Sequence, residues 1–172
     1  MPMLATHAKE ATAMGVYDAA RLFNFEVESS DNLRFIPLAV RFNLDRFGMR
    51  ITLNQWQMLP HDDRVLLARF PVEDESEIEP NFDHAIEEML RTHANVEPEK
   101  FTPESDPVWA HADAVPETVI RQSSLCGVSA PSLSQWAKLD RFQRFALAKL
   151  SRRTGELNHD FMPAMREFGL AE

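Results

Sequence analysis

The sequence has little cysteine and no long apolar run. Cys126 is the only cysteine, which excludes an internal disulfide framework, and one thiolate cannot build a cysteine zinc site. No apolar run approaches the roughly 18 residues of a membrane helix. The first 20 residues hold Lys9 and Glu10 and lack the continuous apolar core of a signal peptide. All five glycines are isolated, so there is no glycine-rich phosphate loop. We therefore expect a soluble cytoplasmic protein.

The excess of acidic over basic residues argues against a dedicated nucleic-acid-binding protein but does not exclude one, because charge can be local. The 172 residues include 18 Lys and Arg against 27 Asp and Glu, which gives a net charge of −9. Affinity for nucleic acid rests on cations that neutralise phosphates. Twelve of the acids fall in residues 71–106, together with only Arg91 and Lys100. The acidity is therefore local, and we interpret residues 71–106 as an acidic insert.

Two segments, residues 36–70 and 115–150, align with each other once one residue is inserted. Ten identities fall in one register, and one of them pairs two of the three tryptophans. The identical pairs are Pro37 and Pro116, Val40 and Val119, Gly48 and Gly127, Leu53 and Leu133, Gln55 and Gln135, Trp56 and Trp136, Leu59 and Leu139, Arg64 and Arg144, Leu67 and Leu147, and Ala68 and Ala148. We interpret the two segments as an internal repeat.

Each segment carries the signals of two helices joined by a turn. Proline favours the first helical position, and the glycine that follows about ten residues later tolerates the left-handed conformation of a helix C-cap. Thr52 and Ser132 are candidate N-caps for the turn that carries the tryptophan, and a second helix follows through residues 64–70 or 144–150. One helical pair cannot bury its apolar face alone. The predicted fold is all-α, with two repeated helix-turn-helix pairs packed as a small helical bundle.

Two further helices are predicted outside the repeat. Apolar residues recur at helical spacing in residues 81–94, which predicts an extra acidic helix between the two helix pairs. Residues 160–168 predict a last short helix. All of these segments belong to a single helical domain over residues 23–170.

Two segments are expected to lack helix, and the interpretation of a third is left open. Prolines in residues 95–114 predict an extended linker. Apolar and polar residues alternate over residues 23–28, which predicts a short extended segment. Residues 1–22 are interpreted as a mobile N-terminal extension or a short helix.

Four residues of the acidic helix have a spacing that could bridge a metal ion. His84 and Glu88 are four apart, as are Asp83 and Glu87, and four-apart side chains share a helix face. Each face offers only two ligands, and no second cluster supplies the others. A solvated acidic face is therefore the favoured interpretation.

Two further positions could carry chemistry. Cys126 aligns with Phe47, just before the glycine, which favours a small buried hydrophobic residue over a nucleophile or redox thiol. Glu156 and His159 have the Glu-x-x-His spacing of a di-iron bundle helix, but that site needs two such motifs and two more carboxylates. We expect no catalytic residue, no metal site and no cofactor.

Charged residues also recur in the second helix of each pair. Asp62, Asp63 and Asp140 fall at the helix starts, where carboxylates satisfy free N–H groups. Arg64 and Arg144 share one position of the repeat, and we interpret both as structural, with the guanidinium paired to a carboxylate or a backbone carbonyl. The same reasoning makes Trp56, Trp136, Gly48, Gly127, Pro37 and Pro116 structural anchors.

Lys149, Arg152 and Arg153 form a basic cluster near the end of the last repeat helix. Cations are favoured at a helix C-terminus, which is one interpretation. The other is a docking patch for an acidic partner surface.

Several stretches resemble the nitrate reductase-associated protein family of cyanobacteria and some proteobacteria, over about residues 23–170. In the closing stretch Phe161, Pro163, Ala164, Glu167 and Phe168 take the family's recurring places. The matching stretches are FNFEVE at 23–28, LRFIPLAVRFNLDRFG at 33–48, LNQW at 53–56, LSQW at 133–136, RFALAKLSR at 144–152 and FMPAMREFGL at 161–170.

The resemblance implies a small, non-catalytic accessory protein of assimilatory nitrate reductase. Its partner would be the catalytic subunit of the reductase, and its role would lie in assembly, cofactor insertion or electron delivery. Two alternatives stay open from the residues themselves. One is a helical nucleic-acid-binding regulator, because Arg141, Arg144 and Lys149 lie on one predicted helix. The other is a small metal-binding protein.

Overall fold

The computed structural model describes residues 21–72 and 81–172, and these residues are mostly helical. Most of the predicted extension at residues 1–22 and part of the acidic insert therefore lie outside the described residues. The helical class expected from the sequence is confirmed, with one small two-stranded sheet besides. The chain divides into two compact units, which are described separately below. Among the described residues, no helix is both long and apolar enough to cross a bilayer.

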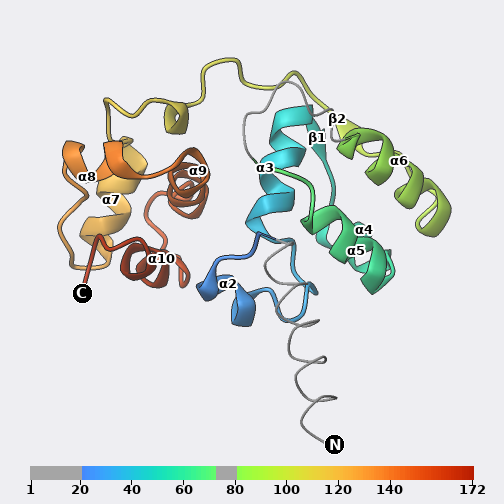
Figure 1. The fold of residues 1–172 in the computed structure, drawn as a ribbon, viewed down its shortest axis with the longest axis horizontal. Helices are drawn as coiled ribbons and strands as arrows, with labels where there is room; N and C mark the ends of the chain where they lie inside the picture. Colours follow the sequence, from blue (N-terminus) through green and yellow to red (C-terminus); the bar gives the residue numbers. More distant parts are fainter. Residues whose placement is uncertain (1–20, 73–80) are drawn as a thin grey trace, which may run out of the picture. The chain divides into compact units, whose positions relative to one another are not determined.

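The first unit contains residues 21–23, 30–72 and 81–103 of the described chain. Helix α3 packs against α5 and α6, and α6 lies along α5 (Figure 1). The apolar side chains between them form one core, which includes Val40, Trp56 and Ile86. The elements are α3 (Leu38–Phe47), β1 (Met49–Arg50), α4 (Leu53–Met58), α5 (His61–Ala68), α6 (Phe82–His93) and β2 (Glu99–Lys100).

Gly48 ends α3 and starts the short sheet. Its φ of +67° is left-handed, and its N–H bonds to the carbonyls of Leu44 and Asp45 as a helix C-cap requires. Phe101 N–H donates to the Gly48 carbonyl at 2.8 Å, just beyond the antiparallel pair of β1 and β2. This bond brings the backbone of residue 101 directly against the glycine.

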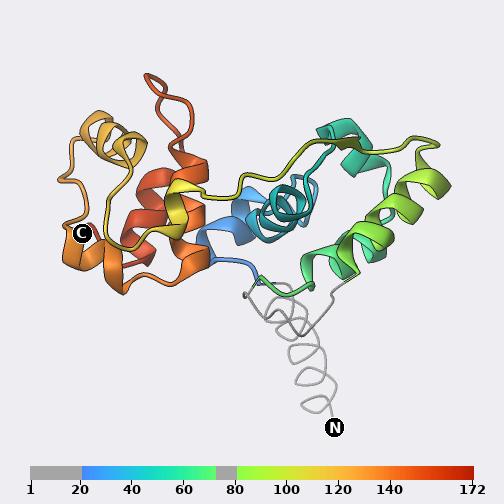
Figure 2. The ribbon, with the colours of Figure 1, turned by 90° about the horizontal axis from the view of Figure 1, so that it is seen from above.

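The second unit contains residues 24–29 and 104–172. Helix α9 contacts η1, α7 and α10, and Figure 2 shows yellow η1 beside α9. Trp136, Leu147 and Phe161 lie in a core between these elements. The elements are α2 (Asn24–Ser29), the 3-10 turn η1 (Val108–Ala110), α7 (Glu117–Leu125), α8 (Leu133–Lys138), α9 (Arg141–Leu150) and α10 (Phe161–Glu167).

The extended segment predicted at residues 23–28 is wrong, because α2 is helical there. The carboxylate of Glu167 accepts the backbone N–H groups of Asn24 at 3.1 Å and Phe25 at 2.9 Å. The Phe25 ring also packs edge-on against Phe168, with ring centroids 6.3 Å apart. A contact from the far end of the chain therefore decides the conformation, and alternating polarity cannot reveal it.

Two smaller expectations also need correction. The linker at residues 95–114 is not wholly extended, since it contains β2 and η1. Pro37 and Pro116 stand one residue before their helices, with extended backbone angles, and not at the first helical position. The predicted helices at 81–94 and 160–168 are confirmed within one residue at each end, as α6 and α10.

Helices α4 and α8 begin with the same capping box. Thr52 and Ser132 each accept the backbone N–H of a glutamine three residues later, and that glutamine side chain accepts the N–H of the capping residue. Both predicted N-caps are therefore confirmed. Each short helix ends at a leucine with extended backbone angles, and the next helix starts two residues further on.

Candidate functional site

Trp56 and Arg64 together hold one backbone carbonyl of the first unit. The Trp56 indole is fully buried and donates to Leu33 O at 2.8 Å. Arg64 Nη1 donates to the same oxygen at 3.0 Å, and Arg64 Nε donates to Leu59 O at 2.9 Å. The two side chains thus fix the segment that precedes α3 to the turn between α4 and α5.

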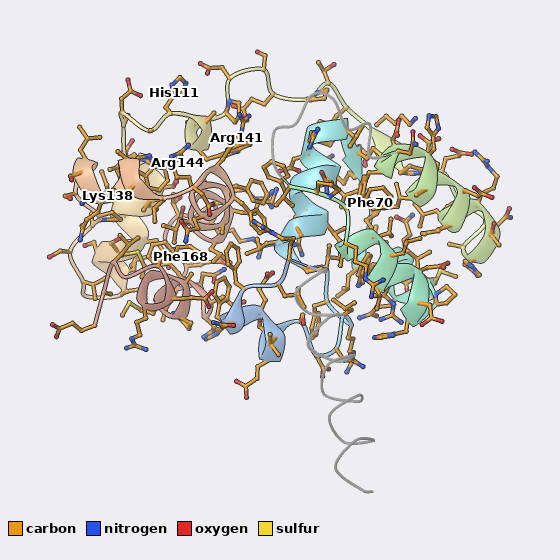
Figure 3. All side chains as sticks on the ribbon, viewed as in Figure 1. Phe70, His111, Lys138, Arg141, Arg144 and Phe168 are labelled. Atoms are coloured by element: carbon orange, nitrogen blue, oxygen red, sulfur yellow. The ribbon has the colours of Figure 1, made fainter. Side chains whose placement is uncertain are left out.

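Trp136 and Arg144 make a similar set of bonds in the second unit, but to two different carbonyls of the preceding segment; Figure 3 labels His111 and Arg144. The buried Trp136 indole donates to His111 O at 2.8 Å. Arg144 donates from Nε to Trp109 O at 3.0 Å and from Nη1 to Leu139 O at 2.8 Å. Both guanidinium groups, of Arg64 and Arg144, are thus engaged by backbone carbonyls, which is a structural use of the charge.

The carboxylates and histidines of α6 do not converge on one point. His84 and Glu88 are exposed, and Glu87 forms an ion pair with Lys100 of β2. The hydrogen bond and charge of Glu87 raise the pKa of Lys100. Asp83 lies on the same helix but does not join these side chains in a group that could bind a metal ion. In the described ranges, no group of three or more His, Cys, Asp or Glu side chains could hold a metal ion.

Cys126 and the Glu-x-x-His motif also lie apart from any cluster of chemical groups among the described residues. Cys126 is half-buried at the end of α7, and burial raises the pKa of its thiol, which disfavours the reactive thiolate. Glu156 and His159 lie in the connection between α9 and α10 and not on a helix. They therefore cannot present the helical ligand pair that a di-iron bundle uses.

Asp63 and Asp140 have local partners, and Asp62 lies beside Asp63 in the same helical turn. Asp140 forms a capping box with Gln143 at the start of α9. Asp62 and Asp63 lie in the first turn of α5, and Asp63 Oδ2 is 3.1 Å from His93 Nε2 at the end of α6. These contacts stabilise helix ends and the packing of α5 on α6.

The second unit concentrates basic side chains between α7 and the end of α9. Residues 121–153 hold seven Lys and Arg and only one acid, Asp140. Several of these cations have partners within the unit. Arg121 pairs with Glu117 at 2.6 Å, Arg141 lies 5.1 Å from the centre of the Trp109 ring, and Lys149 lies 6.0 Å from that of Phe145.

The predicted patch of Lys149, Arg152 and Arg153 is divided between a helix and a loop. Lys149 lies in the last turn of α9, half-buried against an aromatic ring. Arg152 and Arg153 follow the helix and are exposed. No side-chain partner of Arg152 is found in the described part of the chain, and Arg153 is 3.8 Å from the exposed carboxylate of Glu156.

Sequence reasoning missed Gln122, which positions the loop that carries these arginines. Gln122 is 1% exposed on α7, and it bonds to the backbone of residues 156 and 158. A signal was available, because Asn43 aligns with Gln122. Both are amides on the apolar face of the first helix of a pair, and Asn43 similarly donates to the carbonyl of Pro71, after α5. A polar residue at one core position in both segments indicates a buried hydrogen-bonding role.

One of the comparisons with known proteins gives an assignment. A family model, described as conserved nitrate reductase-associated protein, matches residues 22–168 of the chain. No curated protein and no solved structure is significantly similar to the chain. The family match spans both compact units, including α2, α10 and the short helices α4 and α8 that carry Trp56 and Trp136. The chain therefore belongs to the family of conserved nitrate reductase-associated proteins.

Proposed function

We propose that this protein is a non-catalytic accessory protein that binds nitrate reductase and serves its assembly, cofactor insertion or electron delivery. The observation that carries the proposal is the family match over residues 22–168, whose description associates the family with that enzyme. The partner is the catalytic subunit of assimilatory nitrate reductase.

The basic end of α9 and the loop after it are the proposed docking surface. Lys149, Arg152 and Arg153 come from this region, and both arginines are exposed. Charge complementarity at an interface steers association and fixes the relative orientation of the partners. A patch of this sign fits an acidic surface on the reductase.

Co-purification tests the proposal directly. The tagged protein is expressed with the assimilatory nitrate reductase of its host, and the captured material is assayed for reductase polypeptide and molybdenum cofactor. Stoichiometric capture is the expected result. Removal of the gene should lower reductase activity while the reductase polypeptide persists. Absence of capture, with or without cofactor-loaded enzyme, contradicts the proposal.

One observation favours nucleic-acid binding as an alternative function: residues 121–153 contain seven Lys and Arg side chains. Arg144 already donates to two backbone carbonyls, and Arg141 lies over an aromatic ring. These contacts weaken the case for a recognition helix at α9. A salt-sensitive mobility shift with DNA would favour this alternative, and metal analysis of the purified protein tests the metal-binding one.

Three further expectations are kept as proposals. Residues 36–70 and 115–150 are two copies of one helix-turn-helix unit. Residues 23–170 act as one domain. The protein works in the cytoplasm, where assimilatory nitrate reductase would meet it.

A further inference from the structure

The connection between α9 and α10 is exposed along its middle. Residues 152–157, called the arginine loop below, are all exposed, whereas Ser151 before them is fully buried. Figure 2 shows this connection as an orange-red loop that stands away from the helices of the second unit. Gly155 lies in the loop with a left-handed φ of +87°, a conformation that suits a sharp turn.

Both ends of the arginine loop are fixed to one face of α7. At one end the Ser151 hydroxyl is 3.2 Å from Thr118 Oγ1. At the other end Gln122 Nε2 donates to Glu156 O at 2.9 Å, and Gln122 Oε1 accepts Asn158 N–H at 3.0 Å. Thr118 and Gln122 are four residues apart and therefore share a helix face. Hydrogen bonds to Thr118 and Gln122 of α7 therefore hold the loop at both of its ends.

The exposed side chains of the loop combine positive charge with an apolar group. Arg152 and Arg153 are adjacent, and the 3.8 Å pair of Arg153 with Glu156 is long and joins side chains that are 78% and 70% exposed. Solvent screens such a pair strongly. Leu157 is 56% exposed, the highest value for a large apolar side chain in the described ranges.

We propose that the arginine loop is the element that docks on the reductase, and that its site there is an acidic surface with an apolar recess for Leu157. The inference rests on the proposed function and adds the loop, the apolar anchor and the chemistry of the partner's surface. A protein surface is favoured over nucleic acid because a leucine gains nothing on a phosphate backbone. Aliphatic and arginine side chains together suit the core and rim of a protein interface.

Gln122 is a positioning residue in this interface. A loop that is already ordered in its bound conformation loses less entropy on association, and the affinity is correspondingly higher. Because Gln122 is buried, it acts only through the backbone of Glu156 and Asn158.

The loop is tested by measuring the dissociation constant of the full-length protein for the host's assimilatory nitrate reductase. R152E/R153E and Leu157→Asp are each expected to weaken binding by about tenfold or more, as interface anchors do. Matched controls lie elsewhere in the same unit. Lys138→Glu reverses another exposed cation, and Leu133→Asp alters another leucine, 53% exposed, so both should leave the dissociation constant within about threefold.

Gln122→Met tests positioning separately from contact. The substitution keeps the volume of the side chain and removes its two bonds to the loop. We expect weaker capture together with faster amide exchange at Asn158, while amides in the middle of α9 keep their protection. Unchanged affinity with faster exchange at Asn158 would contradict the positioning role.

The outcomes separate the two proposals. Capture by the unaltered protein that the loop variants do not weaken overturns the docking inference and leaves the proposed function intact. No capture by the unaltered protein overturns both. If the unaltered protein retards DNA at low salt, and the loop variants abolish that shift without any reductase capture, the loop binds nucleic acid and the inference is wrong.

Discussion

At the scale of single residues, Gly48 meets two demands that no other residue type satisfies. Its φ is +67°, and a Cβ added there would lie 2.2 Å from the carbonyl oxygen of Phe101. We expect Gly48→Ala to lower the free energy of unfolding by about 2–4 kcal/mol, from backbone strain and the clash together. Urea denaturation, read from the midpoint and slope, measures this change.

Gly127 supplies the matched control for that substitution. It has nearly the same φ, +71°, but a Cβ there would meet nothing within 4 Å. Gly127→Ala should therefore lower the free energy of unfolding only through backbone strain, by about 1–2 kcal/mol. Equal losses in the two variants would show that the contact with residue 101 contributes nothing.

Asp160 is the residue whose titration should be visible in the stability curve. Burial raises the pKa of this half-buried carboxyl above its usual value, while a hydrogen bond from Ser29 and the charge of His159 act in the opposite direction. The folded state therefore binds the proton more tightly than the unfolded state. Ionised Asp160 opposes folding once the pH rises above its folded pKa, and this penalty fades as the pH falls to the ordinary carboxyl range.

Asp160→Asn mimics the protonated side chain at every pH. We expect the variant to be modestly more stable than the parent at pH 7, with the difference vanishing as the pH falls below the ordinary carboxyl pKa. Urea midpoints measured at a series of pH values check this. Glu104→Gln removes one exposed charge of the same unit as a control, and a pH-independent gain in Asp160→Asn would contradict the titration argument.

At the scale of elements, α2 depends on a side chain far away in the sequence. Six residues are too few for a helix to be stable alone in water. The Glu167 carboxylate accepts two of its first N–H groups. Glu167→Ala should therefore release α2, at a cost of about 1–2 kcal/mol.

Amide exchange over residues 24–29 is the measurement for α2. Protection there should fall in Glu167→Ala while the middle of α9 is unaffected. Glu117→Ala, which removes a surface pair with Arg121, is the control and should leave α2 unchanged. If α2 keeps its protection in Glu167→Ala, the packing of Phe25 alone holds the helix.

The difference between local signals and contacts from distant residues explains which elements the sequence predicts. Helices α6 and α10, and the capping boxes at Thr52 and Ser132, depend on signals within a few neighbouring residues, so pattern and spacing are enough. Helix α2 and the 3-10 turn at residues 108–110 depend on Glu167 and Arg144, which bond to them from other elements. The sequence shows two adjacent arginines, Arg152 and Arg153. It does not show that Gln122 positions the loop that carries them, because that role depends on contacts between α7 and the loop.

At the scale of the whole molecule, the net charge of the chain is opposite in sign to the charge of the two arginines in the proposed docking loop. The chain carries −9, and residues 73–79 alone hold five acids and no base, whereas the arginine loop carries two adjacent cations. An acidic partner therefore attracts the loop at short range and is repelled by the rest of the chain at long range. Repulsion of this kind lowers the association rate more than it changes the lifetime of a formed complex.

Neutralising the five acids Glu73, Asp74, Glu75, Glu77 and Glu79 to their amides should raise the association rate with nitrate reductase several-fold at low ionic strength. The dissociation rate should stay the same, because the arginine loop is untouched. The gain should shrink as salt shortens the screening length to about 10 Å at 0.1 M. Stopped-flow or surface-binding kinetics at several salt concentrations measure both rates. A slower association after neutralisation would mean that the acidic insert itself attracts the partner, and the sign assigned to the reductase surface would then have to be reversed.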